Sequence, residues 1–386
     1  MIYLDHNATT PLHPRAFEAM LPFLKELWAN PSSPYRFGSQ AKAAVEFGRG
    51  QIANCIGCKP SEVVFCSGGT ESDNLALRGV VRALKSKGNH IVTTAIEHPA
   101  VLNTCKALEN EGYRVTYLPV TEEGVVEMAA LRASLCDGTI LVTVMHANNE
   151  TGVIQPVEEI ATTTRARGVV FHTDAVQSAG KLDRKLAELG ADLVTFSGHK
   201  LYGPRGVGVL YVREGTPLAP WMTGGTHEHG LRAGTENVAA IAGCAEAVTL
   251  AFEEAETEGH RLRSLRDRFE LQVGAAIQAV RFNGSEAQRV PNTSNISFQD
   301  VDGESVVLGL DVRGICVSTG SACSTDDPEP SHVLRAMGLS PRAAQGSVRF
   351  SLGRDTCAAD LDATVSALKD TVAHLRRVSS IRGDLE

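Results

Sequence analysis

The sequence predicts an α/β protein with a large domain built on a mostly parallel sheet and a smaller α+β domain. Short β-branched runs alternate with helical stretches from about residue 60 to 212. An almost continuous helical pattern follows from 236 to 278, and short strands with an amphipathic end fill the rest. A chain of 386 residues has room for two or three domains of roughly 150 residues each. We expect the large domain to cover residues 13–256, and the small one to cover 1–12 and 257–386.

The first half of the chain supplies the elements of the large domain. The expected strands are EVVFCS (62–67), HIVTTAIEH (90–98), YRVTYLPV (113–120), TILVTVMHANN (139–149), VVFHTDA (169–175) and DLVTFSGHK (192–200). Helical patterns at 71–84, 100–112 and 156–168 alternate with them. The strands are apolar on both faces, which is typical of a parallel sheet covered by helices on both sides.

The second half predicts the link and the small domain. The helical pattern of 236–278 would join the two domains. TSNISF (293–298), ICVS (315–318) and SVRFSL (347–352) read as strands. Near the end, five apolar residues fall at 4,3,4,3 spacing on one helical face: Leu361, Val365, Leu368, Val372 and Leu375.

Composition restricts the class of protein. The formal net charge is -8 and 43% of residues are hydrophobic, which is ordinary for a soluble enzyme and gives no basic face for a nucleic acid or a membrane surface. The 9 cysteines are odd in number and lack the spacing of a disulfide framework. MIYLDHNATTP does not resemble a signal peptide, and no apolar run is long enough for a membrane span. We therefore expect a cytoplasmic protein.

Polar groups gather where the predicted strands end, and ligands of open α/β sheets bind at the carboxyl ends of strands. After the first strand, GGTESDN has two glycines followed by Thr70, with Asp73 three residues further on. This pattern predicts a capped helix N-terminus that could bind a phosphate. An ordinary capped turn without a ligand fits the pattern equally well. Later strand ends deliver further groups: His98, Asn149, Glu150, Asp174, Gln177, Ser197, His199 and Lys200.

This combination indicates pyridoxal phosphate. That cofactor needs a lysine for a Schiff base, a carboxylate for its pyridine nitrogen, a phosphate cup and a flat group over its ring. Lys200, Asp174, Thr70 and His98 would meet those four needs.

A family resemblance spans nearly the whole chain. It is carried by YLDHNATTP, NPSSPYRFG, GGTESDN, EHPAVL, ANNETG, HTDAVQ, SGHKLYGPRGVG, RAGTENV, GSACS, EPSHVLRAMG and VRFSLGR, in this order. The chain resembles the cysteine desulfurases of the NifS/IscS type, in the class-V aminotransferase family. The resemblance implies a pyridoxal-phosphate-dependent transferase of fold type I.

The resemblance also implies roles for single residues. Lys200 would bind the cofactor aldehyde, Asp174 would pair with the pyridine nitrogen, and His98 would stack on the ring and exchange protons. The other implied cofactor contacts are Asn149 and Gln177 at the ring oxygen, and Gly69, Thr70, Ser197 and His199 at the phosphate. Thr235 would reach the phosphate of the other subunit, which implies a homodimer with shared active sites. Arg349, with Asn149, would bind the substrate carboxylate, since a guanidinium offers two parallel donors.

The cysteine of GSACS is Cys323, which the resemblance makes the nucleophile. It would take sulfur from L-cysteine as a persulfide and leave L-alanine. Its spacing to EPSHVLR matches the long-loop members, whose usual acceptor is an iron–sulfur scaffold protein. Cys323 is also the candidate for transient ligation of a cluster on such a scaffold.

Three other interpretations remain open at this stage. One is a selenocysteine or cystine lyase that does not use Cys323, and another is a sulfur donor for tRNA or cofactor thiolation. The third is a non-catalytic docking platform with a vestigial pocket. The sequence assigns no role to His229 or to the pair Cys55 and Cys58, for which zinc or redox use has little support. We expect the six remaining cysteines to lie in the core.

Overall fold

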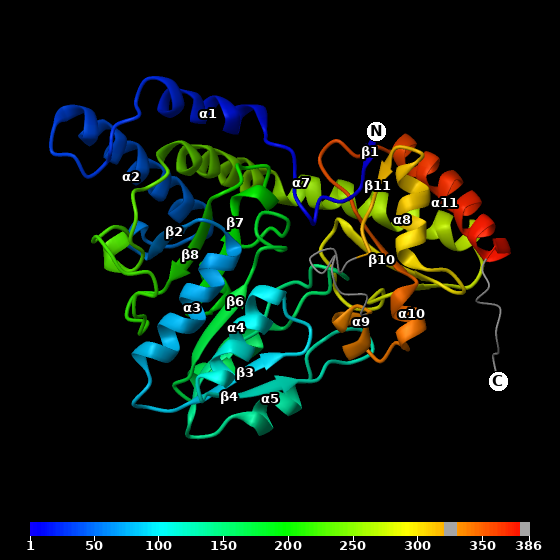
Figure 1. Cartoon of the computed structure of the whole chain (residues 1–386), viewed down its shortest axis with the longest axis horizontal. Coiled ribbons are helices and arrows are strands. Elements are labelled where there is room, and N and C mark those ends of the chain that lie inside the picture. Colours follow the sequence, from blue (N-terminus) through cyan, green and yellow to red (C-terminus); the bar gives the residue numbers. More distant parts are fainter. Residues whose placement is uncertain (320–329, 379–386) are drawn as a thin grey trace.

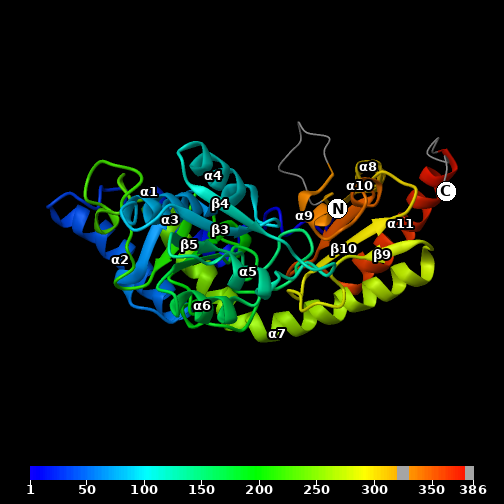
Figure 2. The ribbon, with the colours of Figure 1, turned by 90° about the horizontal axis from the view of Figure 1, so that it is seen from below.

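The computed structural model describes residues 1–319 and 330–378, so the predicted nucleophile Cys323 lies outside the described residues. The chain forms a large body with a seven-stranded sheet and a smaller body with short strands (Figure 1). The helix α7 (Val238–Ala276) runs along both bodies (Figure 2). Within the described residues, no helix is long and apolar enough to cross a membrane.

The large sheet has the strand order β2-β8-β7-β6-β5-β3-β4. Its strands are β2 (Val63–Cys66), β3 (His90–Thr94), β4 (Arg114–Leu118), β5 (Thr139–Thr143), β6 (Val170–Asp174), β7 (Leu193–Ser197) and β8 (Gly208–Val212). The pairings from β4 through β7 are parallel, and β8 runs antiparallel to both β7 and β2. The predicted mostly parallel sheet is therefore confirmed, and β8 is a strand that the sequence analysis did not name.

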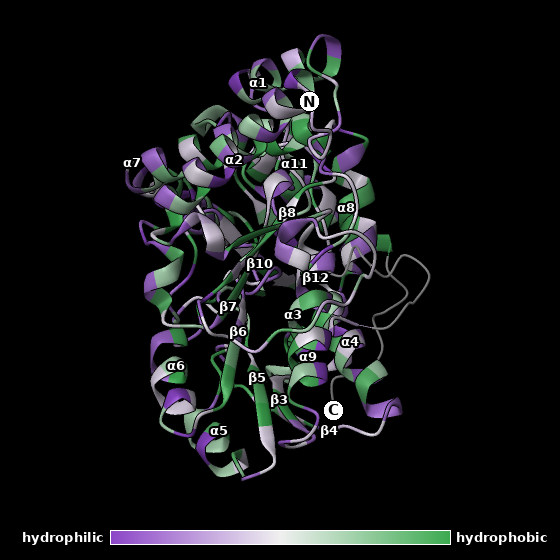
Figure 3. Cartoon of the chain, turned by 90° about the vertical axis from the view of Figure 1, so that its left-hand side faces the viewer, coloured by the Kyte–Doolittle hydropathy of each residue, from purple (hydrophilic) through white to green (hydrophobic). Residues whose placement is uncertain are grey.

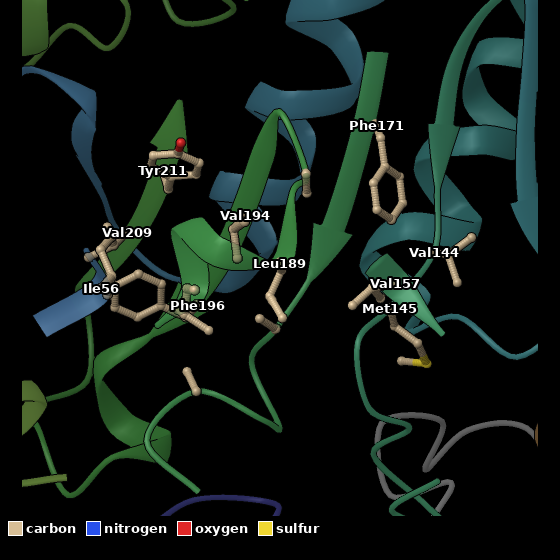
Figure 4. Packing of buried hydrophobic residues seen from close by; sticks show 14 of the residues in the cluster. Ile56, Val144, Met145, Val157, Phe171, Leu189, Val194, Phe196, Val209 and Tyr211 are labelled. Carbon is tan, nitrogen blue, oxygen red and sulfur yellow. The ribbon is translucent and has the colours of Figure 1, made fainter. Parts of the chain in front are cut away.

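Successive residues of the strands feed two separate cores, one on each face of the sheet. Phe171, Val194 and Phe196 belong to one buried cluster (Figure 4), while Val170 and Leu193 belong to another. Figure 3 shows the hydrophobic strands between helices with mixed surfaces. The remaining helices of this half are α1 (Pro14–Lys25), α2 (Arg36–Ile56), α3 (Gly69–Ala83), α4 (Pro99–Asn110), α5 (Met128–Ser134) and α6 (Val157–Arg165). Short 3₁₀ turns occur at η1 (Pro60–Glu62), η2 (Leu186–Leu189), η3 (Gly198–Lys200) and η4 (Glu228–Gly230).

The smaller body has its own core, which includes Leu4, Phe269, Phe350 and Leu368. Its strands and helices are β1 (Ile2–Tyr3), β9 (Val280–Phe282), β10 (Thr293–Phe298), α8 (Gly303–Asp311), β11 (Ile315–Cys316), α9 (His332–Ala336), α10 (Pro341–Gln345), β12 (Ser347–Ser351) and α11 (Ala358–Val378). Residues of the segment 333–344 pack into a core cluster of the large body. The domain boundaries at residues 12 and 256 stay a prediction.

Candidate active site

An open cavity of about 1060 Å³ lies at the carboxyl ends of the parallel strands, where the sheet meets residues of the smaller body. Ten of the twelve predicted site residues line it: Gly69, Thr70, His98, Asn149, Asp174, Gln177, Ser197, His199, Lys200 and Arg349. Thr235 is exposed on the segment that precedes α7. Cys323 falls outside the described residues. Sequence positions between 69 and 349 thus converge on one cavity.

Lys200 follows β7 at the end of the turn η3. Its Nζ donates hydrogen bonds to the backbone carbonyls of Asn7 and Ala8, both at 2.6 Å. Backbone carbonyl oxygens accept hydrogen bonds and carry no full charge, so these two contacts fix the position of the amine. The amine therefore lines the cavity in a position suited to a carbonyl compound.

Asp174 ends β6, and its Oδ1 accepts a hydrogen bond of 2.8 Å from the amide of Val176. Burial raises the pKa of the Asp174 carboxyl to about 6, although that amide and Lys200 lower it. A buried carboxyl of this kind gains from a cationic neighbour, such as a protonated ring nitrogen.

Asp73 has a different place in the structure from the one predicted from the sequence. The N-cap of α3 is Gly68 and no side chain caps the helix, so the predicted pair of Thr70 and Asp73 at a capped start is wrong. Asp73 is instead buried and lines the cavity, and its Oδ1 has no hydrogen-bond partner among the described residues. Burial and the neighbouring Asp174 hold the pKa of Asp73 well above its usual value. Two carboxyl groups therefore face this end of the cavity.

The other end of the cavity suits an anion. It lies at the N-terminus of α3, a helix of 15 residues whose first amides are available to a ligand. The hydroxyl of Ser197 is buried there without a partner in the described part of the chain. His199 is held by Thr9, whose hydroxyl lies 3.1 Å from Nδ1. A phosphate group would satisfy these open donors.

His98 is the N-cap of α4, and its Nδ1 accepts a hydrogen bond of 3.1 Å from the amide of Ala100. This bond places the ring proton on Nε2. Burial, Lys200 and His332 lower the pKa of His98 to about 4. An imidazole usually titrates near neutral pH, but this enclosed ring stays neutral there.

Arg349 comes from β12 and enters the cavity from the smaller body. Its Nη2 donates to Asp5 at 2.7 Å and its Nη1 to the carbonyl of Asn149 at 2.9 Å. The Nε of Arg349 is buried without a partner in the described residues. One donor of the guanidinium is therefore left for a ligand such as a carboxylate.

Asn7 is the functional residue that the sequence analysis left without a role. Its carbonyl accepts hydrogen bonds from Lys200 and from Nε2 of Gln177, and its amide group donates to Asn149 and Thr293. The motif YLDHNATTP was a signal that this segment matters, but nothing local tells which atoms it contacts. Asn7 joins the lysine to both bodies of the molecule.

Asp73, His98 and Asp174 place ligand atoms within 4.8 Å of one another, which is a loose arrangement for a metal ion. Lys200 lines the same cavity, and its positive charge lowers the pKa of both His98 and Asp174. A metal ion bound here would be repelled by the charge of Lys200. An organic cofactor fits better if its basic ring nitrogen faces the carboxyl groups and its phosphate faces the N-terminus of α3.

The comparisons with known proteins agree with this geometry. The sequence model of the class-V aminotransferases matches residues 2–364. A cysteine desulfurase IscS from Dictyoglomus turgidum is 48% identical over 98% of this chain and 96% of that protein. A solved NifS-like protein has a TM-score of 0.91 at 36% identity, covering 97% of this chain and 99% of its own. A structure of SspA in complex with cysteine has a TM-score of 0.80 at 35% identity, covering 91% and 99%.

These matches span almost the full chain and confirm the predicted fold type and family resemblance. The chain belongs to the class-V aminotransferase family and, within it, to the cysteine desulfurases of the NifS/IscS type.

Proposed function

We propose that this protein is a cytoplasmic, pyridoxal 5′-phosphate-dependent cysteine desulfurase that passes sulfur to an iron–sulfur scaffold protein. The substrate is L-cysteine, the product is L-alanine, and Cys323 carries the sulfur as a persulfide. The observation that carries the proposal is one cavity lined by a lysine, two buried carboxyl groups, a helix N-terminus and an arginine with an open donor.

The cavity residues fit the cofactor at both ends. Lys200 supplies the amine, Asp174 holds a proton at the ring nitrogen, and Gly69 and Thr70 with Ser197 bind the phosphate. When bound, the cofactor supplies an electron-withdrawing ring that stabilises negative charge on the adjoining substrate carbon. The buried hydroxyl of Ser197 supports this fit, because an unpartnered buried polar group costs free energy until a ligand satisfies it.

Arg349 binds the carboxylate of L-cysteine. Its guanidinium is already fixed by Asp5 and by the carbonyl of Asn149, so little conformational entropy is lost when a substrate arrives. The unpartnered Nε supports a role in binding an anion from the cavity side.

Lys200 and His98 manage the protons. Lys200 removes the proton from the substrate Cα and returns it during product formation, since its amine is the base that lines the cavity. The His98 ring is neutral at physiological pH, and its Nδ1 is engaged by the amide of Ala100. Its Nε2 therefore carries the ring proton and donates a hydrogen bond to a sulfur atom in the cavity, which stabilises negative charge on that sulfur during proton transfer.

Cys323 receives the sulfur. The carbon–sulfur bond of L-cysteine breaks and a sulfur–sulfur bond to Cys323 forms, and the two thiol protons account for the extra hydrogen of alanine and for the persulfide proton. No external oxidant or reductant is needed. The persulfide then transfers its outer sulfur to the acceptor and restores the thiol.

The active protein is proposed to be a homodimer in which Thr235 reaches the phosphate of the partner subunit. Large apolar side chains are exposed on α1, on α2 and on neighbouring loops, at the end of the molecule remote from the C-terminal helix (Figure 1). The exposed fraction is 72% for Trp28 and 69% for Phe47. Thr235 is itself exposed on the segment that precedes α7, where a second copy would cover it.

The first test is mass spectrometry of the purified protein after brief exposure to L-cysteine, with alanine assayed in parallel. The expected result is one added sulfur atom on the peptide that contains Cys323, with alanine released. The matched control is Cys323→Ser, which should show neither the added sulfur nor alanine turnover. Full alanine turnover in this variant would mean a lyase that does not use Cys323 and would refute the proposal.

A further inference from the structure

Lys181 is a half-buried cation that no part of the proposed reaction uses. It lies just beyond β6, and its Nζ donates to Oε1 of Gln177 at 2.8 Å and to Oδ1 of Asn7 at 3.1 Å. Both acceptors are neutral amides. Lys200 donates to the backbone carbonyl of the same Asn7, so the two lysines are held by one residue.

No acidic group neutralises Lys181 within the described residues. A small second cavity behind Lys200 is lined by Lys181 together with the charged or titratable groups His6, Tyr202, Glu254, Glu258 and Arg354. Glu254 is paired with Arg354, and Glu258 with Arg261. The imidazole of His6 accepts no proton readily, because burial lowers its pKa and Lys181 lowers it further.

On the active-site side, two further cations act on Lys181, namely Lys200 and Arg349. Burial, together with the charges of Lys200 and Arg349, lowers the pKa of Lys181 to about 7. When two protonated amines lie close together, their like charges repel. The pair therefore loses its first proton at a lower pH than an isolated amine would. A charge that is partly removed from water and has no acidic partner costs free energy, so the presence of Lys181 here calls for a role.

Lys181 also determines how Gln177 is turned. An ammonium group only donates hydrogen bonds, so the Gln177 atom that faces it must be the oxygen. Nε2 of Gln177 is then directed to the carbonyl of Asn7, beside Lys200, and becomes the donor on the cavity side. The orientation of this amide therefore depends on Lys181.

We propose that Lys181 is a positioning residue that fixes the side chains of Asn7 and Gln177 and, by its charge, keeps the amine of Lys200 in the unprotonated, reactive form. The inference rests on the proposed function of Lys200 as the lysine that binds the cofactor aldehyde. Lys181 itself touches neither substrate nor cofactor.

The test compares Lys181→Met, which removes the charge, with Lys181→Arg, which keeps it at every working pH. Lys185→Met is the matched control, because Lys185 is an exposed lysine of the same segment. Two quantities are measured: the midpoint pH of the visible absorbance of the cofactor-loaded protein, and the rate at which the cofactor-free protein takes up pyridoxal 5′-phosphate between pH 6 and pH 9, a range chosen to bracket the Lys181 pKa of about 7.

In Lys181→Met we expect the absorbance midpoint to rise by about one pH unit and uptake at neutral pH to slow about tenfold. Lys181→Arg should have a midpoint at or below that of the unaltered protein, and Lys185→Met should match the unaltered protein. A midpoint unchanged in Lys181→Met, or raised in Lys181→Arg, would overturn the inference. If Lys181→Met folds poorly, Lys181→Arg still tests the inference, because a raised midpoint in that variant would contradict it.

The proposed function would fail in a different way. If Lys200 does not bind the cofactor, the unaltered protein gives no pH-dependent visible absorbance, and Lys200→Ala takes up pyridoxal 5′-phosphate as the unaltered protein does. Failure of the inference alone leaves that absorbance and its loss in Lys200→Ala intact.

Discussion

Asp73 and Asp174 show how single residues set the electrostatics of this site. Both carboxyl groups are buried at the same end of the cavity, and each has a raised pKa whose largest cause is burial. Two neighbouring carboxyl groups in a low-dielectric site do not both ionise easily. The pair therefore favours a state with one proton and one negative charge, which is the charge a pyridinium would balance.

Replacement of Asp73 by Asn should make the cofactor-free protein more stable at neutral pH. The folded state of the unaltered protein holds protons on these acids that the unfolded chain has already lost, so stability falls as pH rises from the ordinary Asp value through the raised folded values. Asp73→Asn removes one such group and the like charge beside Asp174. We expect a gain of at least about 1 kcal/mol in the free energy of unfolding at pH 7 and a flatter pH profile.

Denaturant unfolding of the cofactor-free protein at pH 4 and pH 7 measures this effect. The control is Asp311→Asn, because Asp311 is an exposed acid at the end of α8. Asp192→Asn is less suitable because Asp192 is ion-paired with Arg213. If the free energy of unfolding changes equally with pH in Asp73→Asn and in the unaltered protein, the prediction is wrong. Asp73 would then ionise in the folded state as easily as in the unfolded chain.

At the scale of elements, β8 and the start of α3 form a close-packed support for the anion end of the cavity. Gly208 of β8 pairs with Cys66 and Ser197 of the neighbouring strands. A Cβ atom on Gly208 would lie 2.4 Å from the backbone carbon of Gly68, the N-cap of α3. The strand therefore needs glycine here to let the helix start approach the sheet.

Gly208→Ala should weaken cofactor binding by moving the start of α3. We expect about a tenfold loss of pyridoxal 5′-phosphate affinity and a destabilisation of about 1–3 kcal/mol, the usual cost of forcing an extra carbon into a packed region. Equilibrium titration of the cofactor-free protein, with denaturant unfolding alongside, measures both. Gly138→Ala is the control, because a Cβ there meets nothing within 4 Å. Unchanged affinity in Gly208→Ala would mean that α3 does not bind the phosphate.

Elements of this fold were predictable where the sequence pattern is local. The strands of the large sheet are short apolar runs, and all six predicted there begin within one residue of the observed start. The strand β10 matches its predicted bounds of 293–298. The helix α2 went unnamed although its buried residues recur at helical spacing, including Ala41, Val45 and Ile52. Its glycines hide that pattern, since glycine is a weak helix former.

The residues of the site could be predicted from the sequence, but the contacts between them could not. Asn7 and Lys181 lie far from Lys200 in sequence, and only the folded sheet brings them together. Burial was also misjudged for two cysteines expected in the core, because Cys136 and Cys357 are exposed. Cys136 receives a hydrogen bond from Arg114 at a strand start, a contact that no local hydrophobicity pattern contains.

At the scale of the whole molecule, the exposed aromatic residues of α1, α2 and the loop after β8 are the feature that a single chain leaves unexplained. Trp28 packs edge-on against Phe37 at 5.3 Å between ring centres, yet most of its surface faces solvent. The loop with η4 lies at the same end (Figures 1 and 2), and its His227 is 3.4 Å from the hydroxyl of Ser32. Contiguous exposed apolar groups mark interaction surfaces in soluble proteins.

We therefore predict that Trp28→Glu shifts the proposed dimer toward monomers and weakens cofactor binding together with it. A charge placed in an apolar interface is left unpaired, and central aromatic residues of interfaces typically contribute about 2 kcal/mol or more. Sedimentation velocity over a range of protein concentrations measures the association. Titration with pyridoxal 5′-phosphate at the same concentrations then reports whether monomers lose the contact assigned to Thr235.

The control for this prediction is Leu271→Glu, since Leu271 of α7 is also highly exposed but belongs to the part of the helix that runs along the smaller body. It should leave both association and cofactor affinity unchanged. A Trp28→Glu variant that stays dimeric would place the interface elsewhere. If that variant is monomeric yet binds the cofactor with full affinity, the cavity is complete within one chain, and Thr235 has no part in the partner's site.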